Sequence, residues 1–161
     1  MDFDERLKKA VQRGKLRGDE ALRQQREKEL SQQEIKQQHS KYRLQLSEHI
    51  EKCMQRLPNY FPGFQYETVY GDRGWGGACH RDDLDTTTSG RKGNLYSRLE
   101  ITIRPMSKYP ILEMVGKGTI RNKEIYSRSH FSELENVDLD VFMQLIDHWI
   151  IEFAELFAAE K

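Results

Sequence analysis

The apolar residues of this 161-residue chain are distributed very unevenly, which limits the part of it that can build a core. Residues 12–43 contain only 6 of the 59 apolar residues, and the remaining 129 residues contain the other 53. Because burial of apolar surface is the main driving force of folding, this segment contributes little to a core. We therefore predict a polar, partly helical or disordered N-terminal arm, residues 1–30, followed by a single domain, residues 31–161.

Positive and negative charges are separated along the chain, although their sum is zero. The chain has 26 basic and 26 acidic side chains. Residues 6–17 contain six basic and no acidic side chains, whereas residues 135–161 contain one basic and seven acidic side chains. Zero net charge argues against general binding of polyanions, but the basic segment keeps nucleic acid open as a partner.

The composition is that of a chain that neither crosses a membrane nor depends on disulfides. No stretch approaches the roughly 18 consecutive apolar residues of a membrane span, and the charged first residues are unlike a secretory signal. The two cysteines, Cys53 and Cys79, are too few for a disulfide framework. We expect a cytoplasmic protein without a membrane span, and no sequence pattern indicates its oligomeric state.

An amphipathic helix is predicted at each end of the domain. Ser31 and Glu34 form a capping box that starts a helix over residues 32–57, and Pro58 ends it. A second helix covers residues 139–158, where large apolar side chains recur every three or four residues. These side chains are Val141, Phe142, Leu145, Ile146, Trp149, Ile150, Phe153 and Phe157. Their burial, at about 1.5–3 kcal/mol each, makes this helix a main stabiliser of the domain.

The N-terminal arm has a weaker helical pattern. Helical spacing relates its first apolar residues, which are Phe3, Leu7, Ala10 and Val11. Gly14 and Gly18 weaken this helix, because each glycine costs about 1 kcal/mol in a helix interior. The apolar heptad positions that a coiled coil requires are half empty in the arm, so a coiled coil is not predicted.

Alternation of apolar and polar residues predicts four strands, at about residues 64–70, 95–104, 111–116 and 123–131. Residues 71–94 are expected to form a long loop, with room for a short strand around residues 75–80. The order of helix, strands and helix indicates an α+β fold. In this fold an antiparallel sheet of four to five strands has both amphipathic helices packed on one face.

A glycine-rich segment, residues 71–77, is the candidate ligand loop. Glycines let backbone N–H groups approach an anion, but the segment lacks the spacing of a phosphate-binding loop or a dinucleotide fingerprint. The alternative is a hairpin tip without a ligand. Tryptophan is enriched at binding hot spots, so Trp75 is a candidate contact residue. The full set of candidate contacts with a ligand or partner is Arg73, Trp75, Arg91 and Lys92.

Candidate metal-binding and catalytic residues are sparse. His49 and Cys53 are four residues apart on a predicted helix, a spacing that suits joint ligation of zinc, and Cys79 and His80 are adjacent. Neither cysteine belongs to a C-x-x-C pair, so we interpret His49 and Cys53 as members of a buried helix face. No nucleophile has a neighbouring base at a diagnostic spacing. The sequence therefore predicts no metal and no cofactor and indicates no catalytic residue, which favours a protein that is not an enzyme.

Basic and aromatic residues define a candidate nucleic-acid surface in two places. The arm contributes Arg6, Lys8, Lys9, Arg13, Lys15 and Arg17. The sheet contributes Tyr96, Arg98, Tyr126 and Arg128, which we expect to share a solvent-exposed face with Arg104 and His130. Tyrosine and arginine are also common on strand surfaces without a ligand, so a purely structural role is the competing interpretation.

The combination of a packed domain, a core-poor arm and missing motifs favours a non-enzymatic protein-interaction or adaptor module, in which the arm contacts a protein partner. The first alternative is a nucleic-acid-binding protein that uses the basic arm and the polar sheet face. The second alternative is an enzyme or small-ligand binder with its site at residues 71–77.

Overall fold

The structure, a computed structural model, describes residues 2–85 and 93–160 and has an α+β fold. In chain order, the elements are α1 (Phe3–Met54), α2 (Leu57–Tyr60), β1 (Gln65–Val69), β2 (Trp75–Asp85), β3 (Gly93–Ile103), β4 (Ile111–Ile120), β5 (Lys123–Glu133), a 3₁₀ helix (Leu134–Asn136) and α3 (Leu139–Ala159). The strands form one antiparallel sheet in the order β1-β2-β3-β4-β5. The predicted fold class is confirmed.

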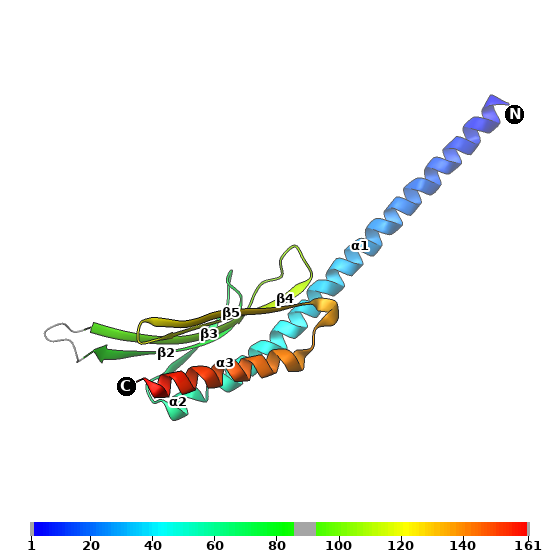
Figure 1. The fold of residues 1–161 in the computed structure, drawn as a ribbon. Helices are drawn as coiled ribbons and strands as arrows, with labels where there is room; N and C mark the ends of the chain where they lie inside the picture. Colours follow the sequence, from blue (N-terminus) through cyan, green and yellow to red (C-terminus); the bar gives the residue numbers. More distant parts are fainter. Residues whose placement is uncertain (1, 86–92, 161) are drawn as a thin grey trace. The chain divides into compact units, whose positions relative to one another are not determined.

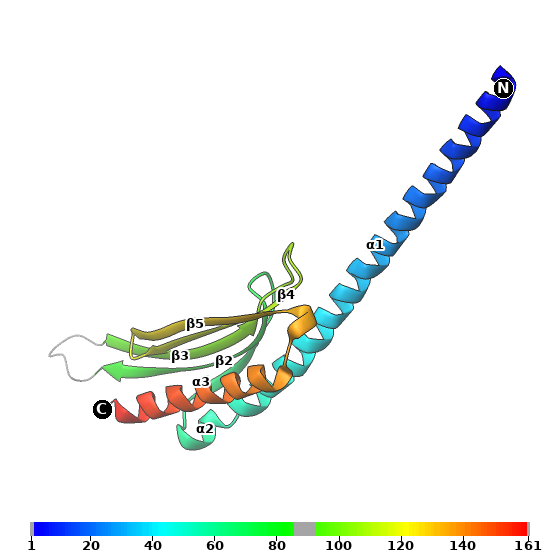
Figure 2. The same cartoon turned by 45° about the vertical axis from the view of Figure 1, so that its right-hand side comes forward.

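The chain divides into two units, residues 1–37 and residues 38–161. The first unit consists of the N-terminal part of α1. The second unit contains the rest of α1, together with α2, the sheet and α3. Within this second unit, α3 and the C-terminal part of α1 lie on the same face of the sheet (Figure 1 and Figure 2). We call this the helix face and the opposite one the open face.

Helix α1 begins much earlier than the predicted helix over residues 32–57. Ser31 lies inside α1, so its capping box does not start a helix. Serine and glutamate are tolerated in helix interiors, and the capping pattern therefore does not require a helix boundary. Gly14 and Gly18 also lie inside α1, and their combined cost of about 2 kcal/mol has not broken the helix.

The C-terminal end of α1 also differs from the prediction. The helix ends at Met54, and the N–H of Arg56 closes it with a tighter bond to the carbonyl oxygen of Cys53 (3.2 Å). Pro58 therefore does not end α1 directly. It lies in the first turn of α2, where the N–H that proline lacks would have no helical partner.

Strand β2 replaces most of the loop that we predicted for residues 71–94. It pairs with β3 along its whole length and with β1 through residues 76–80. The prediction was wrong because glycines normally weaken strands, whereas these glycines allow close contact between backbones. A Cβ atom on Gly76 would lie only 2.0 Å from the carbonyl oxygen of Ile101, and Gly74 has a φ of +133°. The other strands agree with the prediction, and β4 extends further than expected, to Ile120.

The core lies between the helix face of the sheet and the two long helices. Strand β3 contributes Leu99, Ile101 and Ile103, which are fully buried. The ring of Trp149 on α3 packs against Gly116 on β4, where an added Cβ atom would lie 2.6 Å from the ring. The buried residues of α3 are Phe142, Ile146, Trp149, Ile150, Phe153 and Phe157, all of which belong to the predicted apolar stripe.

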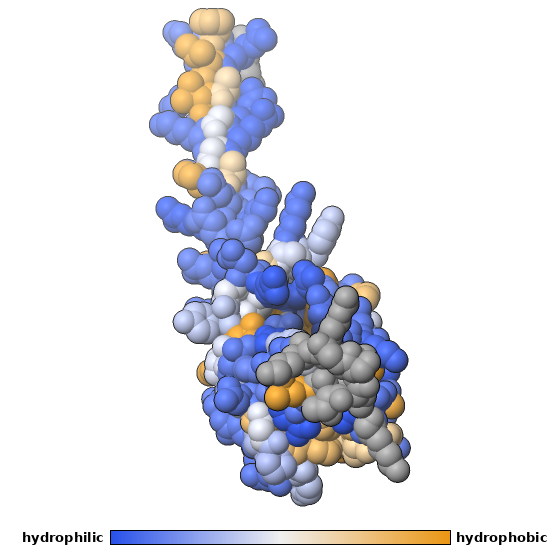
Figure 3. Space-filling model, turned by 90° about the vertical axis from the view of Figure 1, so that its left-hand side faces the viewer, coloured by the Kyte–Doolittle hydropathy of each residue, from blue (hydrophilic) through white to orange (hydrophobic). Residues whose placement is uncertain are grey.

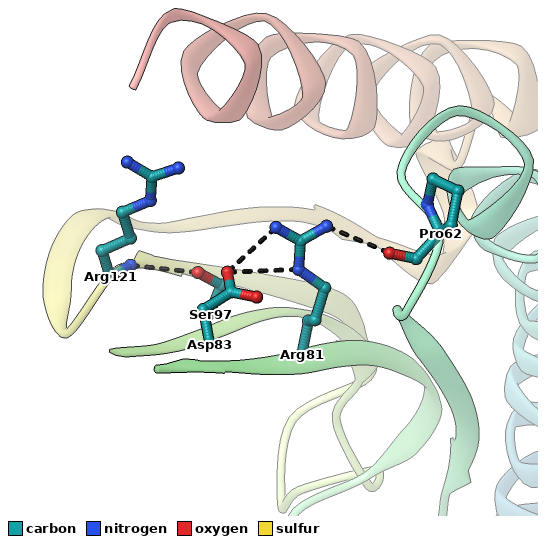
Figure 4. Close-up of polar contacts among 5 residues, drawn as sticks. All are labelled: Pro62, Arg81, Asp83, Ser97 and Arg121. Atoms are coloured by element: carbon teal, nitrogen blue, oxygen red, sulfur yellow. Dashed lines mark hydrogen bonds and ion pairs between the residues drawn. The ribbon is translucent and has the colours of Figure 1, made fainter. Parts of the chain in front are cut away.

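A polar cluster joins the strand ends near the C-terminal end of α3 (Figure 4). Arg81 donates hydrogen bonds to Asp83 (2.9 and 3.2 Å) and to the carbonyl oxygen of Pro62 (3.1 Å). The Ser97 hydroxyl accepts a hydrogen bond from the backbone N–H of Arg121 (3.0 Å). Arg81 therefore connects β2 with the segment before β1, and Ser97 connects β3 with the turn after β4, so both residues have structural roles.

Candidate functional site

Residues 3–22 of α1 carry an apolar stripe along one side of the helix. At 3.6 residues per turn, the stripe occupies an arc of about 120°. Its members are Phe3, Leu7, Ala10, Val11, Gly14, Gly18, Ala21 and Leu22. The large side chains among them are 50–70% exposed, and Figure 3 shows the apolar atoms gathered along this end of the helix. An amphipathic stripe normally faces a core, whereas this one faces solvent.

The six basic residues predicted from the arm are all exposed and lie mainly beside this stripe. On the helical projection, Arg6 and Arg17 flank the stripe on one side, and Lys8 and Lys15 flank it on the other. Lys9 and Arg13 lie further round the helix. The sequence pattern indicated the first four stripe residues, whereas Gly14 and Gly18 were expected to weaken the helix and not to belong to its apolar stripe.

The four residues predicted on the sheet do not share one face. Tyr96 and Arg98 lie on the open face, where Arg98 donates a hydrogen bond to Glu67 (2.5 Å). Tyr126 and Arg128 lie on the helix face, opposite Gly118 and Gly116 of β4. His130, which we expected beside them, is also on the helix face and contacts the ring of Phe142. The expectation that these residues share one solvent-exposed face is therefore wrong.

A bulge opposite Gly118 and Thr119 interrupts the alternation of faces along β5. Ile125 lies at this bulge, and its side chain approaches Gly118, as that of Tyr126 does. Phe131 is on the open face and is 65% exposed, so this apolar side chain points away from the core. Tyr126 is buried instead, and its hydroxyl donates a hydrogen bond to the backbone oxygen of Trp149 (2.8 Å). A tyrosine can be buried when its hydroxyl has such a partner. The strand pattern alone does not distinguish these two arrangements.

Arg128 forms a two-point ion pair with Glu152 on α3, with distances of 2.5 and 2.9 Å. The guanidinium holds the pKa of the Glu152 carboxyl below its ordinary value of 4.5. A depressed carboxyl pKa stabilises the folded state above pH 4.5, and this contribution is lost as the pH falls through the pKa of the folded state.

We expect Glu152→Gln to reduce the acid sensitivity of the domain. The pair is partly exposed, so its contribution at neutral pH is about 0.2–1 kcal/mol. Urea unfolding at pH 7 and at pH 3.5 measures the change, which should be smaller in the variant than in the natural protein. Glu155→Gln, at an exposed position on the same helix, is the control. Equal pH dependence in both variants would contradict the assignment.

The glycine-rich segment is a packing element, and of its two described contact candidates, Arg73 and Trp75, only Arg73 is fully exposed. Trp75 is half-buried, with the guanidinium of Arg43 lying 4.0 Å from its ring centre. Arg73 is exposed and borders a hollow of about 390 Å³ on the open face. This hollow is lined by Asp72, Arg73, Glu100, Thr102, Arg104, Val115 and Lys117. Arg91 and Lys92 lie outside the described residues.

Three potential ligands converge between α1 and α3. The Nε2 atom of His49 is 2.8 Å from Oδ1 of Asp147, and the Sγ atom of Cys53 is 3.4 Å from the same oxygen. The third distance, from Sγ of Cys53 to Nε2 of His49, is 3.6 Å. The sequence placed His49 and Cys53 together by their helical spacing. It gave no signal for Asp147, which comes from α3, 94 residues after Cys53.

This cluster is not arranged as a catalytic cysteine site. In such a site, a histidine uses one ring nitrogen for the nucleophile and the other for an orienting carboxylate. Here the same nitrogen, Nε2 of His49, faces both Cys53 and Asp147. Burial, and then the hydrogen bond to Asp147, raise the pKa of the Cys53 thiol to about 11. The thiol is therefore protonated at neutral pH and is a weak nucleophile.

The cluster lies at the edge of a groove of about 460 Å³ in the helix layer. The groove is lined by His49, Lys52, Cys53, Arg56, Leu57, Tyr60, Asp147, Ile150, Ile151 and Ala154. Two of these residues, Lys52 and Arg56, are cationic, and Tyr60 and Ile151 are largely exposed. The three converging side chains thus remain accessible from solvent.

None of the helices within residues 2–85 and 93–160 is both long and apolar enough to span a membrane. Comparisons of the chain with known protein families, with curated proteins and with solved structures find no match.

Proposed function

We propose that this protein is a non-enzymatic interaction module in which residues 3–22 of α1 bind an acidic amphipathic helix of a partner protein. The observation that carries this proposal is the exposed apolar stripe on a helix whose residues 2–34 are all exposed. An isolated helix is marginally stable in water, because most helical stability in proteins comes from packing of an apolar face. Packing of the stripe against a partner would supply this stability.

The basic residues that flank the stripe favour an acidic partner. Arg6 and Arg17 on one side, and Lys8 and Lys15 on the other, would face the flanks of a helix docked on the stripe. Opposite charges at these positions stabilise a helix pair and determine the choice of partner. A second copy of the same segment would place like charges together, which disfavours self-association of this segment through the stripe.

The small residues of the stripe also favour a helical partner. Ala10, Gly14 and Gly18 are four residues apart, so they form a shallow line that runs beside the larger Leu7 and Val11 side chains and ends at Leu22. Small residues at this spacing let two helix backbones approach closely. The two glycines, unfavourable in a lone helix, would then contribute to the fit of the bound state.

The proposal is tested with the full-length protein and two designed helical peptides that share one leucine stripe. One peptide has glutamates beside the stripe and the other has lysines. We expect fluorescence anisotropy to show at least ~10-fold tighter binding of the acidic peptide, since each 1.4 kcal/mol corresponds to a factor of ten. Leu7→Glu should weaken this binding by at least ~10-fold, because burial of a leucine contributes about 1.5–3 kcal/mol.

Leu16→Glu is the matched control. It makes the same change of side chain and charge at a leucine that is 69% exposed but lies on the opposite side of the helix. It should leave binding of the acidic peptide close to that of the natural protein. Equal weakening by both variants, or equal affinity for both peptides, would overturn the proposal.

Nucleic acid and anionic membranes are the competing ligands of a basic helix. The same assay with a single-stranded RNA oligonucleotide and with phosphatidylserine vesicles distinguishes these ligands from a protein partner. Tighter binding of the RNA or of the vesicles than of the acidic peptide would show that residues 3–22 bind that ligand and not a protein helix.

A further inference from the structure

We propose that His49, Cys53 and Asp147 bind a divalent transition-metal ion, and that Zn²⁺ fits this set of ligands best. The site lies wholly within residues 38–161 and is independent of the partner proposed for residues 3–22. Its ligand atoms, one from each residue, all lie within 4.8 Å of one another. A mixture of thiolate, imidazole and carboxylate is typical of zinc and unlike the all-oxygen sites of Ca²⁺ and Mg²⁺.

The distances in the cluster match those between ligands of one tetrahedral ion. Bonds of about 2.0 Å to nitrogen and oxygen and about 2.3 Å to sulfur separate nitrogen from oxygen by about 3.3 Å, and sulfur from either by about 3.5–3.6 Å. The structure has 3.4 and 3.6 Å for the two sulfur pairs. The nitrogen and oxygen of His49 and Asp147 are 2.8 Å apart, so they need to separate by only about 0.5 Å.

The fold positions the three side chains before any ion arrives. His49 and Cys53 are four residues apart, so they lie one above the other on the same side of α1. Buried Ile50 of α1 and Ile146 of α3, each adjacent to a ligand residue, fix the two helices against the core. Shared hydrogen bonds to Asp147 hold the side chains together, and the ion would replace these bonds.

The three protein ligands leave a fourth position directed at the groove. Structural zinc sites normally have four protein ligands, whereas sites that bind water or a substrate have three. Cys53 gives up its thiol proton to solvent on binding, so the thiolate and the Asp147 carboxylate neutralise the two charges of the ion. Lys52 and Arg56 also line the groove and would favour hydroxide or a small anion in the fourth position.

The experiment is a titration of the full-length, chelator-treated protein with Co²⁺, followed by its absorption spectrum. We expect a thiolate-to-cobalt charge-transfer band and the strong d–d bands of a tetrahedral ion, saturating at one ion per chain. Addition of Zn²⁺ should remove both sets of bands, because zinc binds such a site more tightly than cobalt. A spectrum without a charge-transfer band would overturn the proposal.

Three variants identify the ligands. Cys53→Ser should abolish the charge-transfer band, and Asp147→Asn, which keeps the shape of the side chain, should weaken cobalt binding by at least ~10-fold. His148→Gln changes an adjacent, largely exposed histidine of α3 and should have no effect. A band that persists in Cys53→Ser, or equal affinities of Asp147→Asn and His148→Gln, would overturn the site. Far-ultraviolet circular dichroism of Asp147→Asn confirms that its fold is retained.

Discussion

Trp149→Ala is expected to destabilise the domain by about 3–5 kcal/mol, the range observed when a buried tryptophan is truncated. Trp149 is 4% exposed, and its ring fills the space above Gly116 on β4. Gly116 has no side chain that could fill that space after truncation. A domain of ordinary stability, about 5–15 kcal/mol, would lose a large part of its free energy of unfolding.

Urea unfolding followed by circular dichroism measures this loss as a lower midpoint. Ile151→Ala is the control on the same helix, since Ile151 is 64% exposed and its truncation should cost about 0.5 kcal/mol or less. Similar midpoints for the two variants would show that Trp149 is not a core residue. Helix α3 also carries Asp147. Under conditions in which Trp149→Ala detaches α3 from the sheet, we therefore expect weaker cobalt binding.

Gly76→Ala is expected to cost about 3 kcal/mol or to prevent folding of the sheet, at the upper end of the range for overpacking. The new Cβ atom would lie 2.0 Å from the carbonyl oxygen of Ile101 and 2.8 Å from the Cα atom of Thr102. Both atoms belong to the backbone of β3, which is fixed by pairing on both of its sides. The strain therefore cannot be relieved by a change of rotamer.

Gly77→Ala is the matched control in the next residue of β2. Its Cβ atom would meet the ring of Tyr66 at 2.7 Å, and this ring is the far end of a side chain that can rotate. We expect a cost of about 1 kcal/mol, clearly below that of Gly76→Ala. Equal urea midpoints for the two variants would contradict the assignment of Gly76 to a close backbone contact. They would also favour the alternative that the glycine-rich segment is a flexible loop.

The two proposals place different functions on different parts of the chain. The apolar stripe of residues 3–22 is a docking surface without catalytic groups, and the His49 cluster is a ligand site inside the folded unit. The Leu7→Glu variant therefore retains the cobalt spectrum if both proposals hold. Failure of one assay leaves the result of the other unaffected.

The sequence determined the fold class and most of the core, because these depend on periodic patterns within single elements. The stripe from Phe142 to Phe157 predicts a buried helix, and the alternation around Leu99 predicts a strand, without knowledge of any other element. The helical spacing of His49 and Cys53 was visible for the same reason. Local patterns of this kind are retained in the structure because burial of their apolar side chains stabilises the elements that carry them.

Three features depend on contacts with a neighbouring element and follow only from the tertiary structure. The glycines of β2 are favourable only because the backbone of β3 lies close to them, which no local propensity describes. Tyr126 is buried because α3 offers a carbonyl oxygen to its hydroxyl, although its strand pattern fits either face. Asp147 joins His49 and Cys53 only because α3 packs beside α1. A pair of residues on one helix becomes a candidate metal site through a contact between segments 94 residues apart in the chain.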